Sequence, residues 1–246
     1  MIAWFYNLVF ILAAVFYVPS LLLKGKWHRA LVSRLGPVPE DVARFCSAGP
    51  VVWVHAVSVG EVQAVSHFIR LLPARVPGVK IVLTTVTQTG YHLAFSRLGS
   101  DCRVLYAPLD LSWVVRHYIR RIRPSLYVTA ETEIWPNLFM RLAGQHVPVV
   151  VFNGRVSRKS FTRYRAVAVL TRGILKHVTL FCVQTEADAG RIRLLGAPAD
   201  RVHVLGNVKF DEASDEDGYS REGAGYDARD DVWVAGSTHP GKRRSS

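Results

Sequence analysis

Short apolar runs and longer amphipathic stretches alternate along this chain. The runs are rich in Val, Ile, Leu and aromatic residues, and most of them end at Gly, Pro, Thr, Asn or Asp. Between them, apolar positions recur every three or four residues, as in a helix that buries one face. The predicted strands are 51–57, 79–83, 103–106, 126–129, 147–152, 179–183 and 202–205. This alternation predicts an α/β fold built on an open sheet.

The stretch 51–72 predicts a strand, a tight turn and a helix, which Pro73 and Pro77-Gly78 are expected to end. Ser58 and Gly60 occupy the turn, and Glu61 stands at the entrance to the helical period. Ligands of open α/β sheets bind outside the carboxyl ends of the strands, so Glu61 is a candidate general base facing a cleft. The alternative interpretation is structural, because the helix macrodipole favours a carboxylate in the first turn.

Two further loops between predicted strands and helices carry polar side chains. The loop 84–90 contains four threonines and Gly90, which can cap a helix and offer backbone N–H groups to a phosphate or sugar. The segment 130–137 places Glu131, Glu133 and Trp135 at the end of another strand. The structural alternatives are a plain capping loop and, for the carboxylates, ion pairs with nearby arginines above a packed indole.

The first segment of the chain is uniformly apolar. Residues 2–23 contain no charge and would cover roughly 30 Å as a helix, which is the thickness of the bilayer core. A cleaved signal peptide would need a basic start, and a buried core helix rarely runs so long without a charge. Because Lys24, Lys26, Arg29 and Arg34 follow, we expect residues 1–24 to be a transmembrane anchor with the remainder in the cytoplasm.

Charge is distributed unevenly along the chain. Residues 1–210 carry 26 basic and 10 acidic groups, whereas residues 211–246 carry 5 and 9. A basic domain of this kind favours nucleic acid, anionic lipid headgroups or phosphorylated substrates. The three cysteines, Cys46, Cys102 and Cys182, are too far apart for a zinc-type pair and predict buried thiols in a reduced compartment. No metal cluster is visible.

Several motifs together resemble the 3-deoxy-D-manno-octulosonic acid (Kdo) transferases, which attach Kdo to lipid A. The motifs, in chain order, are His-Ala-Val-Ser-Val-Gly-Glu at 55–61, Thr-Thr-x-Thr-x-Thr-Gly at 84–90, Glu-x-Glu-x-Trp-Pro-Asn at 131–137, Asn-x-Arg-x-Ser at 153–157, Gly-Asn-x-Lys-Phe-Asp at 206–211 and Ser-Thr-His-x-Gly at 237–241. The last motif departs from the family pattern, because Lys242 stands where the family has Glu.

The resemblance implies an inverting GT-B glycosyltransferase, in which two Rossmann-like domains enclose the reaction. This chain would hold a transmembrane anchor (1–24), the N-terminal Rossmann-like acceptor-side domain (25–211), a linker (212–231) and the truncated start of the C-terminal donor-binding domain (232–246). The C-terminal domain would be largely missing. The implied partners are a CMP-Kdo donor, a lipid A precursor acceptor and the inner membrane, with no cofactor and no metal.

The resemblance also implies roles for individual residues. Glu61 would be the catalytic base, and Glu131 or Glu133 would orient the acceptor or tune Glu61. The implied substrate-binding residues are Ser58, Gly60, Thr85, Thr87, Thr89, Gly90, Glu131, Glu133, Asn153, Arg155, Ser157, Asn207, Lys209, Ser237, Thr238 and His239.

Two other functions compete with this interpretation. The first is a catalytically inactive, membrane-anchored fragment whose basic domain binds anionic lipid or lipid A. The second is a nucleic-acid-binding domain, against which the apolar segment and the lack of a known nucleic-acid motif argue. We expect this chain alone to transfer no Kdo, unless a separate chain supplies the second domain.

Overall fold

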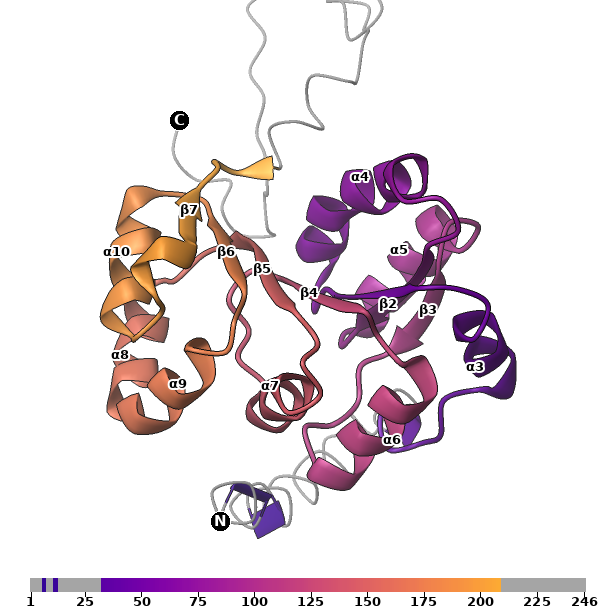
Figure 1. Ribbon diagram of the computed structural model, residues 1–246, viewed down its shortest axis with the longest axis horizontal. Coiled ribbons are helices and arrows are strands. Elements are labelled where there is room, and N and C mark those ends of the chain that lie inside the picture. The colour runs from indigo at the N-terminus through magenta and orange to yellow at the C-terminus, as the bar shows by residue number, and fades with distance from the viewer. Residues whose placement is uncertain (1–5, 8–10, 13–31, 209–246) are drawn as a thin grey trace, which may run out of the picture. The chain divides into compact units, whose positions relative to one another are not determined.

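Seven parallel strands form one sheet in the order β3-β2-β1-β4-β5-β6-β7 (Figure 1). The strands are β1 Val51–His55, β2 Lys80–Thr85, β3 Arg103–Tyr106, β4 Leu126–Ala130, β5 Val149–Gly154, β6 Leu180–Val183 and β7 Val202–Val204. The chain adds strands to one side of β1 up to β3 and then continues from β4 on the other side. This order is that of a doubly wound Rossmann-like sheet, so the predicted α/β class is confirmed.

The structure is a computed structural model that describes residues 6–7, 11–12 and 32–208. These residues lie in one unit, Met1–Lys209, and the other unit, Phe210–Ser246, is outside them. The predicted linker, the start of a second domain and the site residues Lys209, Ser237, Thr238 and His239 therefore fall outside the described residues. Most of the predicted anchor does so too. Within the described parts of the chain, no helix is long and apolar enough to cross a membrane.

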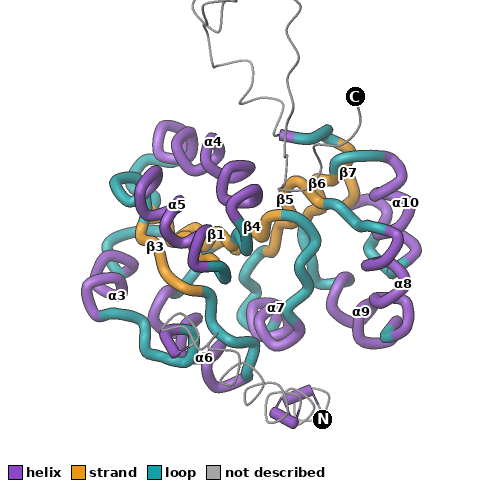
Figure 2. Tube along the Cα trace, turned by 180° about the vertical axis from the view of Figure 1, so that it is seen from behind, coloured by secondary structure: helices purple, strands orange, loops and turns teal. Residues whose placement is uncertain are grey.

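Helices cover both faces of the sheet (Figures 1 and 2). Their bounds are α3 Glu40–Cys46, α4 Val59–Arg75, α5 Gln88–Leu98, α6 Ser112–Ile122, α7 Pro136–Ala143, α8 Arg158–Ala166, α9 Ala168–Leu175 and α10 Glu186–Leu194, with a short 3-10 turn at Ala199–Arg201. Helices α4 and α5 pack on one face, and α3, α6, α7, α9 and α10 pack on the other. Each face of the sheet therefore has its own apolar core.

Strand β1 divides its side chains between the two cores. Val51 and Trp53 join the core beneath α6 and α7, whereas Val52 and Val54 join the core beneath α4 and α5. Trp53 is fully buried, and its ring packs edge-on against Tyr127 of β4 at 5.3 Å between centroids. These contacts fix β1 and β4 as the central pair of strands. The three cysteines are free and buried, as predicted.

Helix α4 ends between the two predicted helix-breaking positions, Pro73 and Pro77-Gly78. Helix α4 continues through Pro73 to Arg75, and its last hydrogen bond runs from Val76 N to Leu72 O at 2.9 Å. Proline disrupts a helix by removing one N–H and crowding the preceding turn. Because Pro73 lies in the final turn, little of the helix remains beyond it to be disrupted.

A buried carboxylate caps α7 from a distant part of the chain. Asp110, which is 1% exposed, accepts hydrogen bonds from Asn137 N at 3.0 Å and Leu138 N at 2.9 Å. The residue before the helix, Trp135, makes no side-chain cap. Asp110 therefore satisfies N–H groups that the first turn of α7 leaves without helical partners. Burial raises the pKa of Asp110 to about 6.

We expect Asp110→Ala to lower the free energy of unfolding by about 1–3 kcal/mol, because two buried N–H groups lose their acceptor. Urea denaturation followed by circular dichroism measures this change. The matched control is Asp101→Ala, which removes a carboxylate that lies 3.9 Å from Arg70 on the surface. Its effect should stay within about 0.5 kcal/mol. Equal destabilisation by the two substitutions would contradict the capping role of Asp110.

Candidate active site at the switch point of the sheet

The carboxyl ends of β1 and β4 mark the place where the strand order reverses. Ligands of doubly wound sheets bind at this switch point, because the connections leave the two strands in opposite directions and open a crevice. The loop after β1 leads to Glu61, and the loop after β4 carries Glu131 and Glu133. Parallel pairing of the two strands thus brings together carboxylates that are seventy residues apart in the chain.

Glu61 is held rigidly in the first turn of α4. It is 7% exposed, and its Oε2 accepts a hydrogen bond from Val57 N at 2.8 Å. Its Oε1 accepts from Ser58 Oγ at 3.0 Å. The side chain therefore folds back over its own turn, so that both oxygens are fixed relative to the strand end.

The pKa of Glu61 lies close to neutral pH. Burial raises its pKa to about 7, although the hydrogen bonds from Val57 and Ser58 act in the opposite direction. The negative charges of Glu131 and Glu133 raise the pKa further. A carboxylate with such a pKa can accept a proton at neutral pH and release it afterwards, which is the requirement for a general base.

The loop after β4 has an unusual backbone and a second perturbed carboxyl group. Glu131 has a positive φ of 55°, a conformation that few residues other than glycine adopt. Burial raises the pKa of Glu133 above its ordinary value, and the nearby charge of Arg34 opposes only part of this rise. The Arg34 guanidinium also lies over the Trp135 ring, 5.7 Å from its centroid. Arg34 therefore belongs to this site.

Aromatic side chains pack around His55 at the carboxyl end of β1. His55 is 2% exposed, and its Nδ1 lies 3.0 Å from Thr84 Oγ1. Its ring meets the Trp135 ring edge-on at 5.4 Å between centroids and stacks with Tyr127. Burial and the charge of Arg34 lower the pKa of His55 to about 3, so the imidazole is neutral at physiological pH. His55 therefore serves here as a neutral packing group.

The threonine loop supports the turn that carries Glu61. Thr87 Oγ1 accepts a hydrogen bond from Gly90 N at 3.0 Å and donates one to Val57 O at 3.2 Å. A Cβ on Gly90 would lie 2.8 Å from Thr87 Oγ1, so only glycine allows this approach. Thr85 is buried and Thr89 is exposed. The capping role of this loop is therefore observed, and a role in substrate binding remains a prediction.

Asn153 connects the end of β5 to the segment that follows β7. Asn153 is 2% exposed and has a positive φ of 53°. Its Oδ1 accepts a hydrogen bond from Val208 N at 3.4 Å, and its backbone carbonyl accepts one from Gln184 Nε2 at 3.1 Å. Asn207 lies half-buried beside this contact. The exposed Ser157 caps α8 by accepting from Ser160 N at 3.1 Å, and the exposed Arg155 precedes it.

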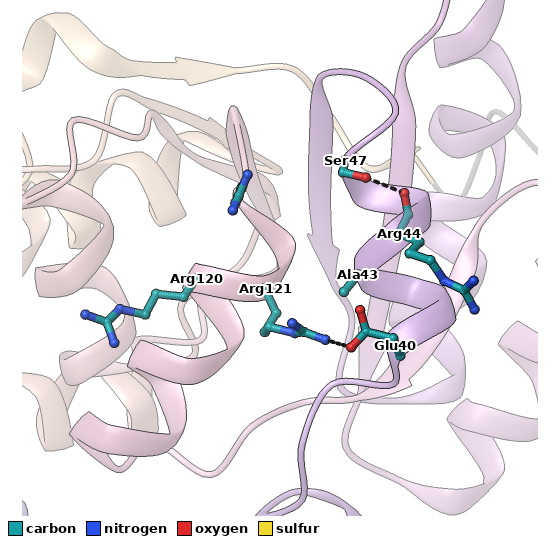
Figure 3. Close-up of a pocket in the computed structure, with 7 residues that line it drawn as sticks. Glu40, Ala43, Arg44, Ser47, Arg120 and Arg121 are labelled. Atoms are coloured by element: carbon teal, nitrogen blue, oxygen red, sulfur yellow. Dashed lines mark hydrogen bonds and ion pairs between the residues drawn. The ribbon is translucent and has the colours of Figure 1, made fainter.

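A basic pocket lies at the other end of the strands from Glu61 (Figure 3). It measures about 180 Å³ and is lined by Glu40, Ala43, Arg44, Ser47, Arg120, Arg121 and Arg123. Arg121 pairs with Glu40 across the gap between α6 and α3. Because α3 leads into β1 and α6 leads into β4, this pocket sits at the amino ends of the strands, away from Glu61. We call these side chains the arginine pocket.

No group of three or more His, Cys, Asp or Glu side chains is arranged to hold a metal ion within residues 6–7, 11–12 and 32–208. Sequence reasoning missed two residues of the site. The sequence places Arg34 only among the basic residues after the apolar segment, and it assigns no role to Asp110. The pairing of Arg34 with the Trp135 loop spans about one hundred residues, and no local pattern signals it.

Solved structures share this fold. The structure of S. aureus MnaA with UDP is 14% identical and covers 72% of this chain and 51% of its own, with a TM-score of 0.50. A UDP-N-acetylglucosamine 2-epimerase structure is 13% identical and covers 70% of this chain and 52% of its own, also with a TM-score of 0.50. The likeness shows the fold, a Rossmann-like domain, in which the carboxylates at the switch point form the candidate site.

The family can also be stated. A family profile described as 3-Deoxy-D-manno-octulosonic-acid transferase (kdotransferase) matches residues 29–212. The Kdo transferase of Haemophilus influenzae is 31% identical over 200 residues, which are 80% of this chain and 47% of that protein. The Kdo transferase of Chlamydophila psittaci is 30% identical over 96% of this chain and 56% of its own length. The chain belongs to the Kdo transferase family of glycosyltransferases, and it spans about half the length of these relatives.

We expect Glu131→Gln to lower the pKa of Glu61, because the substitution removes a neighbouring negative charge that raises it. Carboxyl ¹³C NMR titration of the labelled protein measures the pKa directly. Glu133→Gln should act in the same direction. The control Glu186→Gln, at the exposed start of α10, should leave the titration of Glu61 unchanged. Identical titration curves in all three variants would rule out the coupling of the carboxylates.

Proposed function

We propose that the protein to which this chain belongs transfers Kdo from CMP-Kdo to a lipid A precursor, with Glu61 as general base. The observation that carries this proposal is the position of Glu61 at the switch point, with a pKa raised to about 7 and two hydrogen bonds that fix its orientation. Membership of the Kdo transferase family supports the chemistry, because transfer of Kdo to a hydroxyl group releases the proton of that hydroxyl, which a base can take.

In the proposed reaction, ionised Glu61 takes the proton from a hydroxyl group of the acceptor sugar. The hydroxyl oxygen forms a bond to the anomeric carbon of Kdo, and the bond from that carbon to the phosphate oxygen breaks. The electron pair leaves with CMP. Because the hydroxyl attacks the face opposite the departing phosphate in a single displacement, the configuration at the anomeric carbon inverts. General-base assistance of this kind contributes roughly 10²- to 10⁴-fold to the rate.

The neighbouring carboxylates have a separate proposed role. Glu131 and Glu133 raise the pKa of Glu61 and, as hydrogen-bond acceptors at the cleft, would orient the acceptor hydroxyls. Burial raises the pKa of Glu133, and the charge of Arg34, which opposes part of this rise, would favour its ionised form. Ser58 and Thr87 would act indirectly, by holding the turn that carries Glu61.

The donor is proposed to be held mainly by a second domain, in the same polypeptide or in a separate chain. Lys209, Ser237, Thr238 and His239 would then contribute to the donor site, together with Asn207, Arg155 and Ser157 at the adjacent strand ends. Holding donor and acceptor in place can contribute roughly 7–11 kcal/mol of barrier lowering. We therefore expect transfer only when both domains are present.

We expect Glu61→Gln, made in a protein that carries both domains, to lower kcat by roughly 10²- to 10⁴-fold. The substitution keeps the shape of the side chain and removes the base. The wild-type rate should rise with pH through about 7, since Glu61 must be ionised to act. Transfer of Kdo to a lipid A precursor is the assay. Glu40→Gln, at the arginine pocket, is the control and should leave the rate unchanged. Full activity of Glu61→Gln would remove Glu61 from the mechanism.

Attachment to the cytoplasmic face of the inner membrane is proposed as well. The basic charge of residues 1–210 and the apolar segment 2–23 support it. Helix α8, which follows β5, carries a cluster of exposed basic residues. They are Arg158, Lys159, Arg163 and Arg165.

A chain that begins at Lys26 should adhere to anionic vesicles, and salt should weaken the attachment. Replacing the three arginines of α8 by Ser should weaken binding by up to about 3 kcal/mol, since each basic residue at a membrane surface contributes about 1 kcal/mol. Vesicle sedimentation measures this. The matched control replaces Arg44, Arg120 and Arg123 of the arginine pocket. Binding that is indifferent to salt, or lost equally in both variants, would contradict the role of α8.

A further inference from the structure

The loop that follows β4 is tied to a helix that follows a different strand. Residues 131–135 come directly after β4 and carry two carboxylates, and we call them the carboxylate loop. The Tyr164 hydroxyl, on α8, donates a hydrogen bond to Thr132 O at 3.0 Å. The same hydroxyl accepts a hydrogen bond from the backbone N–H of Ile134. One side chain thus contacts both of the peptide groups that join Glu133 to its neighbours.

Helix α8 holds Tyr164 in a fixed position. Tyr164 and Phe161 are three residues apart, so they share one face of α8, and both pack against the core on the side of the sheet that α6, α7 and α9 cover. The backbone carbonyl of Tyr164 accepts hydrogen bonds from Val167 N at 3.3 Å and from Thr171 Oγ1 at 3.0 Å. Thr171 is 2% exposed. The corner between α8 and α9 therefore anchors the base of the Tyr164 side chain.

The hydroxyl of Tyr164 is in the protonation state that these hydrogen bonds require. Burial raises the pKa of Tyr164, and the negative charge of Glu133 raises it further. The phenol therefore keeps its proton at physiological pH and can donate it to Thr132 O. The electrostatic effect of Glu133 also means that its carboxylate and the phenol lie close together.

A structural explanation covers only part of this arrangement. A buried tyrosine usually finds a hydrogen-bond partner, so a single bond to a carbonyl would need no further reason. Here the hydroxyl donates and accepts on the two sides of Glu133. The loop also begins with a positive φ at Glu131, which persists only where surrounding contacts hold it. At the other end of the loop, Arg34 lies over the Trp135 ring.

From these contacts we propose that Tyr164 is a positioning residue for the transfer reaction. Its hydroxyl fixes the backbone on both sides of Glu133, so that this carboxylate keeps one orientation at the switch point. Tyr164 touches no reacting atom and acts through Glu133, so the proposal rests on the proposed role of Glu133 in orienting the acceptor. Positioning matters because a displacement of about 1 Å can lower a rate by about 100-fold.

The first test is hydrogen exchange of the full chain, followed by mass spectrometry of peptides that cover the carboxylate loop. Tyr164→Phe keeps the ring and its packing but removes the donor to Thr132 O and the acceptor of Ile134 N–H. We expect the amides of residues 131–135 to exchange about 2- to 10-fold faster, which corresponds to the loss of one hydrogen bond.

The matched control is Thr162→Val, which removes a hydroxyl group from the exposed side of the same helix. Thr162 Oγ1 donates to Arg158 O at 3.1 Å. Exchange in the carboxylate loop of this variant should match that of the unaltered chain. Unchanged exchange in Tyr164→Phe, or equally fast exchange in Thr162→Val, would overturn the proposal.

The second test measures Kdo transfer by a protein that carries both domains. We expect Tyr164→Phe to raise the KM for the lipid A precursor by about 2- to 10-fold. The KM for CMP-Kdo should not change, because Glu133 is proposed to orient the acceptor alone. A variant that was merely destabilised would contain less active enzyme, which lowers the apparent kcat and leaves both KM values unchanged.

A double-mutant cycle shows whether Tyr164 acts through Glu133. Added to Glu133→Gln, the Tyr164→Phe substitution should change the KM for the lipid A precursor little further. An unchanged acceptor KM in Tyr164→Phe, or a fully additive effect in the double variant, would overturn the positioning role. Absence of Kdo transfer in the unaltered two-domain protein would overturn the proposed function and, with it, the part of Tyr164 in transfer. Faster exchange in Tyr164→Phe would still show that Tyr164 holds the loop, so the two failures are distinguishable.

Discussion

The parallel pairing of β1 with β4 is the constraint on which the rest of the structure depends. Trp53 and Tyr127 interlock beneath this pair, and the strand order reverses across it. Since connections leave the two strands in opposite directions, their carboxyl ends cannot be covered by a single helix. The crevice that results is lined by whatever residues follow those two strands. In this chain, they are carboxylates.

The chemistry of the site follows from a balance of burial and hydrogen bonding. Burial alone would neutralise Glu61, and hydrogen bonds alone would keep it a weak base. The two effects oppose each other and leave a pKa of about 7, which the nearby negative charges of Glu131 and Glu133 help to maintain. The positive φ of Glu131 fits the same picture, because strained backbone is common where a loop must present a side chain to a ligand.

Asp110 joins the first described residues of the chain to the site. It satisfies the first turn of α7, and it also accepts a hydrogen bond from Tyr6. The loop with Glu133 leads directly into α7, so a single buried carboxylate connects the N-terminal segment, the helix and the carboxylate loop.

The sequence by itself determined the strands, the α/β class and the place of Glu61 at a helix entrance. These features are local, because β-branched runs and a helical period record which face of each element is buried. Motif spacing also identified the family. Only the tertiary structure decided that Arg34 joins the Trp135 loop, that Asp110 caps α7 and that Asn7 binds Ser112. Periodicity shows which face is buried but not which element covers it, and the pKa of a buried carboxylate depends on those distant neighbours.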